Sequence, residues 1–106
     1  MRVELDVFSG RPNPCWELDE SQGDELLQLQ GQLELSRSGG AEPPALGYRG
    51  FVYSDASGPV RAYRGCVKTL HALYADPSRR VERYLLEQMP APYATLRAQV
   101  ASELDA

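Results

Sequence analysis

The chain has 106 residues, of which 42% are hydrophobic and 25% are charged. This length predicts a single domain, residues 1–106, with a modest core. The formal net charge of -4 argues against non-specific nucleic-acid binding, which requires clustered positive charge. No apolar run approaches transmembrane length and the N-terminus does not resemble a signal peptide, so we expect a cytoplasmic protein without membrane contact.

The cysteine and histidine content gives little support for metal or covalent chemistry. Cys15 and Cys66 are expected to be free thiols in a reducing compartment. Together with His71, the only histidine, they lack the paired C-x-x-C spacing of a zinc motif. A phosphate-binding glycine motif and a G-x-S-x-G nucleophile motif are also absent from the sequence. We therefore expect no metal site and no cofactor.

The first predicted element is a strand over residues 2–8. Val3, Leu5 and Val7 alternate with polar residues, which is typical of a strand with one buried face. Asp6 then points to the opposite face, close to the loop that follows.

That loop, FSGRPNPCW over residues 8–16, is the most unusual stretch of the sequence. Gly10 can adopt a positive φ that turns the chain, and two prolines stiffen the segment. One interpretation is a rigid binding loop that presents Arg11, Asn13 and Trp16. The other is a rigid connector, in which Trp16 fills the core and Arg11 pairs with a nearby carboxylate.

A helix is predicted from about residue 20 to residue 35. Asp19 and Gln22 have the spacing of a capping box at its start. The following residues, 36–47, contain three glycines, two prolines and two serines, and they predict a mobile connection.

Residues 48–54 and 60–68 predict two strands of a β-hairpin, with a turn at Asp55–Gly58. Two registers are open. We favour the one that places Phe51 opposite Tyr63. The other, shifted by one residue, would place Arg49 directly opposite Arg64, which is unfavourable unless an anion lies between them.

Two helices are predicted near the C-terminus. Asp76 and Pro77 are typical of a helix start, and Pro90 ends a helix over residues 77–89. Pro92 then opens a second helix, whose apolar stripe comprises Tyr93, Leu96, Val100 and Leu104. Residues 69–75 carry no clear signal.

The string from Asp6 to Pro14, with Trp16 and Leu18 after it, resembles the opening of small bacterial proteins that have no assigned activity. The resemblance covers about one eighth of the chain. It implies that the motif recurs, and it implies no activity, cofactor or catalytic residue.

The elements together predict an α+β fold, with a small antiparallel sheet of about three strands and helices packed on one face. The opposite face, rich in Tyr and Arg, is expected to be exposed.

For function, we expect a non-catalytic binding or accessory protein, with a protein or peptide as its partner. Arg, Tyr and Trp are frequent anchors of such interfaces. The candidate contact residues are Asp6, Arg11, Asn13, Trp16, Arg49, Tyr63 and Arg64.

Two alternatives remain open. One is a small enzyme at the same loop, with Asp6 as base, Arg11 as anion clamp and Cys15 as nucleophile. The other is an acidic inhibitor of a basic partner. The sequence does not indicate the oligomeric state.

Overall fold

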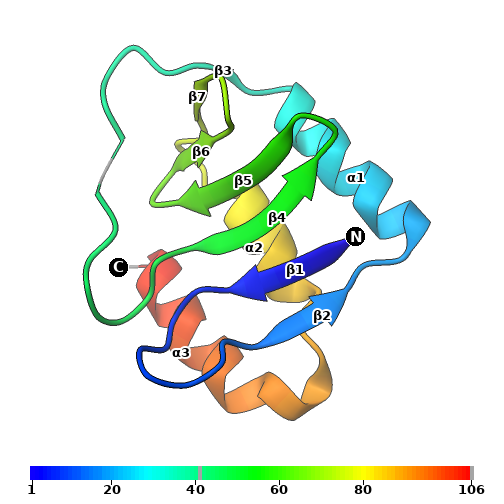
Figure 1. Ribbon diagram of the computed structural model, residues 1–106, viewed down its shortest axis with the longest axis vertical. Coiled ribbons are helices and arrows are strands. Elements are labelled where there is room, and N and C mark those ends of the chain that lie inside the picture. Colours follow the sequence, from blue (N-terminus) through cyan, green and yellow to red (C-terminus); the bar gives the residue numbers. More distant parts are fainter. Residues whose placement is uncertain (41, 106) are drawn as a thin grey trace.

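The computed structural model describes residues 1–40 and 42–105, so Ala41, inside the predicted connection, and Ala106 lie outside the described part. The chain forms an α+β fold in which three α-helices pack with one antiparallel sheet (Figure 1). The strands are β1 (Arg2–Leu5), β2 (Cys15–Glu17), β3 (Glu34–Leu35), β4 (Phe51–Asp55), β5 (Gly58–Tyr63), β6 (Cys66–Lys68) and β7 (Leu73–Ala75). The helices are α1 (Glu20–Gly31), α2 (Arg80–Glu87) and α3 (Ala94–Asp105), and a 3₁₀ helix, η1 (Ala91–Tyr93), precedes α3.

The predicted fold class is confirmed, but the predicted sheet of about three strands was wrong. The sheet has seven strands in the order β2-β1-β4-β5-β6-β7-β3, and every neighbouring pair is antiparallel. The additional strands have only two or three residues each, too few for an alternating pattern to identify them. One of them, β7, lies in the segment that carried no signal.

The core lies between the sheet and the helices. In Figure 1, α2 and α3 lie behind the sheet, and none of the described helices covers the front face of β4, β5 and β6. The alternation predicted for the first strand is confirmed, because Val3 and Leu5 are fully buried and Val7 packs against the core. Asp6, as expected, belongs to the other face, where it contacts arginine side chains.

The start of α1 is capped by an aspartate, as predicted. The Asp19 carboxylate accepts from Gln22 N, and Gln22 Oε1 accepts from Asp19 N, which completes the capping box. α1 ends at Gly31 rather than near residue 35, because Glu34 pairs with Ala75 and begins a new strand. α2 begins at Arg80 rather than at residue 77, with Asp76 Oδ2 accepting from Val81 N across an intervening turn.

The last helix follows the prediction more closely. Pro92 lies in η1, which leads directly into α3. Val100 and Leu104 are buried, and Tyr93 and Leu96 pack against the core, so the predicted apolar stripe is confirmed as docked core.

The hairpin of β4 and β5 has the predicted antiparallel pairing and the predicted turn at Asp55–Gly58, but the favoured register was wrong. Phe51 pairs with Ala62, not with Tyr63. This is the register that would bring Arg49 opposite Arg64. The clash does not occur because the ladder stops at Phe51: Gly50 bends the chain with a φ of 95°, and Arg49 turns toward Asp6.

The predicted second strand, residues 60–68, is divided by a tight turn at Arg64-Gly65. Both residues have positive φ, 48° and 77°, as a type I′ hairpin turn requires. The turn is held by a buried carboxylate from α2. Glu82 Oε1 accepts from Arg64 N at 3.1 Å, and Glu82 Oε2 accepts from Gly65 N at 3.0 Å.

Candidate functional site

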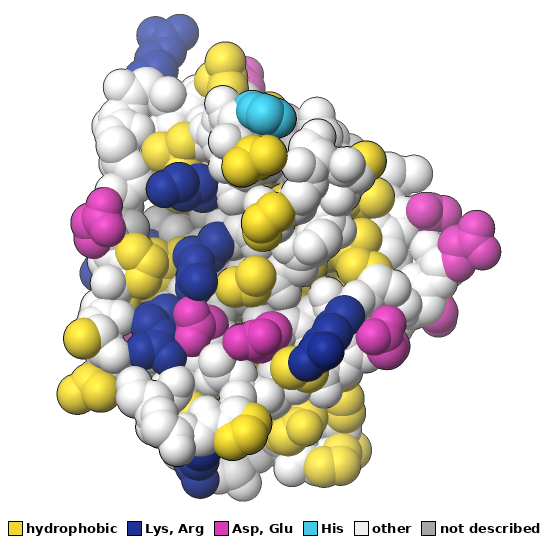
Figure 2. Space-filling model, in the orientation of Figure 1, with side chains coloured by type: hydrophobic (Ala, Val, Ile, Leu, Met, Phe, Trp, Pro, Cys, Tyr) yellow, Lys and Arg dark blue, Asp and Glu magenta, His cyan; other side chains and the backbone are white. Residues whose placement is uncertain are grey.

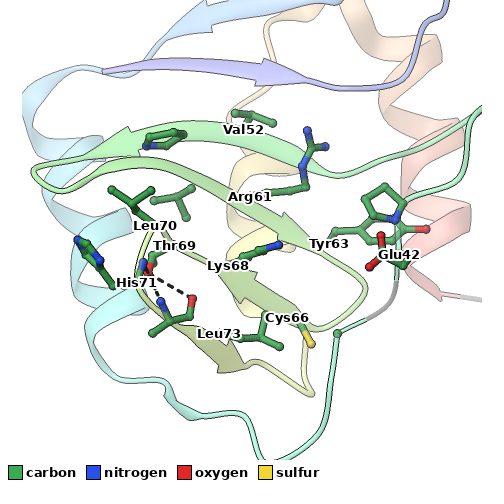
Figure 3. A pocket seen from close by; sticks show the side chains of 15 residues that line it. Glu42, Val52, Arg61, Tyr63, Cys66, Lys68, Thr69, Leu70, His71 and Leu73 are labelled. Atoms are coloured by element: carbon green, nitrogen blue, oxygen red, sulfur yellow. Dashed lines mark hydrogen bonds between the residues drawn. The ribbon is translucent and has the colours of Figure 1, made fainter.

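The outer face of the sheet, opposite the helices, carries a groove of about 680 Å³. Its floor comes from β4, β5, β6 and β7, one end from the β6–β7 turn, and one wall from the connection before β4 (Figure 3). The described residues that line it include Glu42, Pro43, Val52, Pro59, Arg61, Tyr63, Cys66, Lys68, Leu70, His71 and Leu73.

The register of the strands aligns four of these side chains in one row. Val52 pairs with Arg61, Arg61 pairs with Lys68, and Lys68 pairs with Leu73. Side chains directly opposite each other in antiparallel strands project from the same face of the sheet. The row therefore places two adjacent cations between two aliphatic side chains, in the middle of the groove. Figure 2 shows the same face, with a column of Lys and Arg side chains next to hydrophobic ones.

The two cations of the row differ in their partners. Arg61 Nη1 donates to Asp6 Oδ2 at 2.8 Å and to the carbonyl oxygen of Arg49 at 2.6 Å. Lys68 is exposed and forms no salt bridge with a carboxylate in residues 1–40 or 42–105. Its ammonium group is thus the cation of the groove that is free to meet a ligand.

Asp6 is the centre of a polar network beside the groove, on the same face of the sheet. Its carboxylate contacts Arg61 on one oxygen and Arg49 on the other, with an Arg49 Nη2–Asp6 Oδ1 distance of 2.8 Å. Burial raises the pKa of Asp6, but the hydrogen bonds and charges of Arg61 and Arg49 outweigh it, so the pKa lies below its ordinary value. Asp6 is a structural anion here, because an ionised carboxylate with a lowered pKa is a weak base.

Arg49 ties this network to two loops. Its Nη2 donates to the carbonyl oxygen of Phe8 at 2.6 Å, and its Nη1 donates to the carbonyl oxygen of Ala45 at 2.7 Å. Ser9 Oγ also donates to Ala45 O. The Arg49 guanidinium therefore joins residues 8–9 to residue 45, although these segments are far apart in the sequence.

Asn13 holds the conformation of the loop from inside. Its Oδ1 accepts from the backbone N–H groups of Val7 and Phe8, and its Nδ2 donates to Glu4 and Asp6. All four contacts are internal.

Arg11 is exposed and stands apart from the Asp6 network. Its guanidinium carbon lies 3.8 Å from the centroid of the Phe8 ring, in a cation–π contact across the loop. This contact takes the place of the pair with a nearby carboxylate that the connector interpretation predicted.

Trp16 lies in the core, as the connector interpretation predicted. It is 7% exposed and packs its ring against Phe51 and Tyr93. It reaches this position because Trp16 pairs with Val3 across β1 and β2 and shares its buried face. Its Nε1 is buried and has no hydrogen-bond partner among the described residues.

Tyr63 and Arg64 have different surroundings. Tyr63 is only 8% exposed, because it lies against Tyr48 at one end of the groove. Arg64 is exposed and occupies the turn between β5 and β6, where its backbone donates to Glu82. Among the predicted contact residues, the structure thus brings Asp6, Asn13 and Arg49 together and leaves Trp16 and Arg64 elsewhere.

The residues that sequence reasoning missed are Lys68, Leu70 and Leu73 in the groove and Glu82 in the core. Two features of the sequence could have indicated Lys68. It is the only lysine, and it follows Val67, which is buried, so its side chain points to the opposite face of the strand. Leu70 and Leu73 lie in the segment without a clear pattern. Glu82 had no signal, because its partners are backbone groups of a turn that the sequence did not reveal.

The three residues of the enzyme alternative pair with different side chains. Asp6 is paired with two arginines, Arg11 lies over Phe8, and Cys15 Sγ accepts from Arg2 at 3.2 Å. Across residues 1–40 and 42–105, no group of three His, Cys, Asp or Glu side chains is placed to hold a metal ion.

Comparison with known proteins found no matching family model, no matching curated protein and no matching solved structure. Within the described part of the chain, no helix has the length and apolar character needed to cross a membrane.

Proposed function

We propose that this chain is a non-catalytic binding protein that recognises a protein or peptide partner on the outer face of its sheet. One observation carries the proposal: the half-buried Val52 and Leu73 are aligned with a lysine that has no carboxylate partner among the described residues, in a groove that none of the described helices covers. Such a surface combines the apolar area that drives association with a charge that orients the partner.

The exposure of Leu70 supports this assignment. Its side chain is 62% exposed at one end of the groove, although transferring a leucine side chain out of water is energetically favourable. Leu73 and Pro59 lie in the same groove and extend the apolar surface. A partner that covers this cluster gains hydrophobic burial without a rearrangement of the core.

The loop over residues 8–16 contributes in a second way. The Asp6–Arg49 pair and Asn13 hold it against the sheet, so the outer face and the loop form one preorganised surface. Preorganisation lowers the entropy cost of binding. We propose that a partner larger than the groove also reaches Arg11, which is exposed at the edge of this surface.

The alternatives have less support. An enzyme with Asp6 as base would need that carboxylate free, and both of its oxygens are engaged by arginine. An acidic inhibitor would need an acidic contact face, and the row at the groove centre is cationic.

The proposal is tested by selecting a phage-displayed library of random nonapeptides on the immobilised full chain. We expect enriched peptides whose affinity falls at least tenfold on Leu70→Asp. The matched control is Leu35→Asp, since Leu35 is similarly exposed, at 65%, but does not line the groove. Failure to enrich any peptide, or equal loss of affinity in both variants, would contradict the proposal.

A further inference from the structure

We propose that the groove binds an extended peptide segment in which an aspartate or glutamate contacts Lys68 and the residues two positions before and after it are apolar. This inference rests on the proposed function and specifies the partner's chemistry.

The register places two rows on the groove floor, two residues apart along β5 and β6, and residues two positions farther along the chain provide a third. Arg61 and Lys68 pair in the central row, and Tyr63 and Cys66 pair in the row at one end. Pro59 and Leu70 lie beyond Lys68 at the other end. The separation of successive rows is about 6.6 Å, the rise of two residues in a strand. An extended segment that runs along the strands points every second side chain at the floor, so three alternate side chains meet three rows.

Charge selects the central side chain. Arg61 and Lys68 are like charges directly opposite each other, an arrangement that is unfavourable without an anion nearby. Asp6 neutralises Arg61 from the same face of the sheet, and Lys68 has no carboxylate partner in the described residues. A carboxylate above Lys68 completes an ion pair with the one cation of the row that Asp6 does not neutralise.

The other titratable groups of the groove lie toward its ends. Figure 3 shows Glu42 beside Tyr63 at one end and His71 beside Leu70 at the other, with Lys68 between them. Glu42 disfavours a second acid at its end of the groove.

The end rows select apolar side chains. One end presents Leu70 and Pro59, and the other presents Pro43, Cys66 and the edge of Tyr63. The cation thus lies between two apolar regions. A chain-terminal carboxylate on Lys68 would leave one of these regions empty, so the geometry points to an acidic side chain inside a longer segment.

Three fluorescein-labelled heptapeptides test the inference: TLTETLT, TLTQTLT and TLTKTLT, each acetylated and amidated. Fluorescence anisotropy with the full chain gives the dissociation constant of each peptide. We expect the Glu peptide to bind about tenfold more tightly than the Gln peptide, the effect of one charged hydrogen bond. This advantage should shrink as NaCl is raised from 50 to 500 mM, because salt screens the ion pair.

Charge reversal identifies the contact. Lys68→Met should remove the preference for Glu, and Lys68→Glu should make the Lys peptide the tightest of the three. Arg97→Met, which removes one charge from an exposed position on α3, should leave the preference unchanged. If the Gln peptide binds the groove as tightly as the Glu peptide, the inference fails and the proposed function stands. If none of the three peptides binds, the inference fails, and the library selection decides the proposed function separately.

Discussion

Asp6 and Arg49 are joined through both side chain and main chain: Arg49 Nε donates to Asp6 Oδ1 at 2.9 Å, and Arg49 N donates to the Asp6 carbonyl oxygen at 2.7 Å. The pair continues the contact between the first strand and the hairpin beyond the last paired residues of β1 and β4. The same carboxylate then reaches Arg61 on β5. One side chain therefore connects the loop, the connection before β4 and the groove floor.

Asp6→Asn should lower the free energy of unfolding by about 2 kcal/mol, because it leaves two partly buried arginines without their anion. Urea denaturation followed by tryptophan fluorescence measures this, since the single tryptophan is buried. Asp24→Asn, at an exposed position on α1, is the control and should change the value by less than about 0.5 kcal/mol. Equal effects of the two substitutions would show that the network contributes nothing to stability.

Some of this architecture is readable from sequence, because it depends on neighbouring residues. The capping box of Asp19 and Gln22, the alternation of Val3 and Leu5, and the turn at Asp55–Gly58 each need only a few adjacent residues. The pairing of Glu34 with Ala75 depends on residues about forty positions apart, and no local pattern encodes it. The seven-stranded sheet was therefore beyond prediction, although the fold class was not.

The candidate site also contains residues that the sequence identifies and contacts that it does not. Asp6 was identifiable as a polar residue near a stiff loop and Arg49 as a polar residue of the predicted hairpin, but their partnership depends on how the hairpin pairs with the first strand. The favoured register failed because it treated Arg49 and Arg64 as ladder residues, whereas Gly50 and the turn at Gly65 remove both from the ladder. Lys68 became a candidate only when the register placed it beside Arg61.

Glu82→Gln should destabilise the fold by about 3 kcal/mol, since it breaks a buried ion pair and weakens several hydrogen bonds. Glu82 is 1% exposed and accepts from Tyr48 Oη at 2.6 Å as well as from Arg79 and the β5–β6 turn. Equilibrium denaturation at pH 7 measures the effect. Glu87→Gln, at an exposed position on the same helix, should be nearly neutral. A loss no larger than that of the control would contradict this account of the turn.

The cost of Glu82→Gln should also depend on pH. Burial raises the pKa of Glu82, whereas hydrogen bonds from Arg79, Tyr48 and Gly65 lower it. The lowering is the larger effect, so the pKa of Glu82 in the folded state lies below its ordinary value. A lowered folded pKa means that the stabilisation is fully present above the unfolded pKa of about 4.3. It is lost as the pH falls through the folded pKa. Denaturation curves measured at falling pH should show the difference between wild type and variant beginning to shrink below about pH 4.3, and a difference that stays constant below that pH would refute the assignment.

Gly50→Ala should destabilise the hairpin by about 2–4 kcal/mol. Gly50 has a φ of 95°, and an added Cβ would collide with the carbonyl oxygen of Ala62 and with Tyr63 Cβ. Gly39→Ala is the matched control, because nothing lies within 4 Å of its Cβ position and its φ is not positive. That variant should be neutral or slightly stabilising. Thermal denaturation of both variants measures the loss of stability. If Gly50→Ala is as stable as Gly39→Ala, the described bend at Gly50 is contradicted.

Arg11→Lys should separate binding from folding. The guanidinium stacks on Phe8 at an exposed position, so replacing it costs less than about 1 kcal/mol of stability. If Arg11 contacts the partner through two parallel hydrogen bonds, lysine cannot reproduce them, and affinity should fall by about 1–3 kcal/mol. The melting temperature and the affinity for a peptide or protein obtained by selection are measured on the same preparation. A large fall in melting temperature with unchanged affinity in the folded fraction would make Arg11 structural. The partner surface would then be confined to the groove around Lys68.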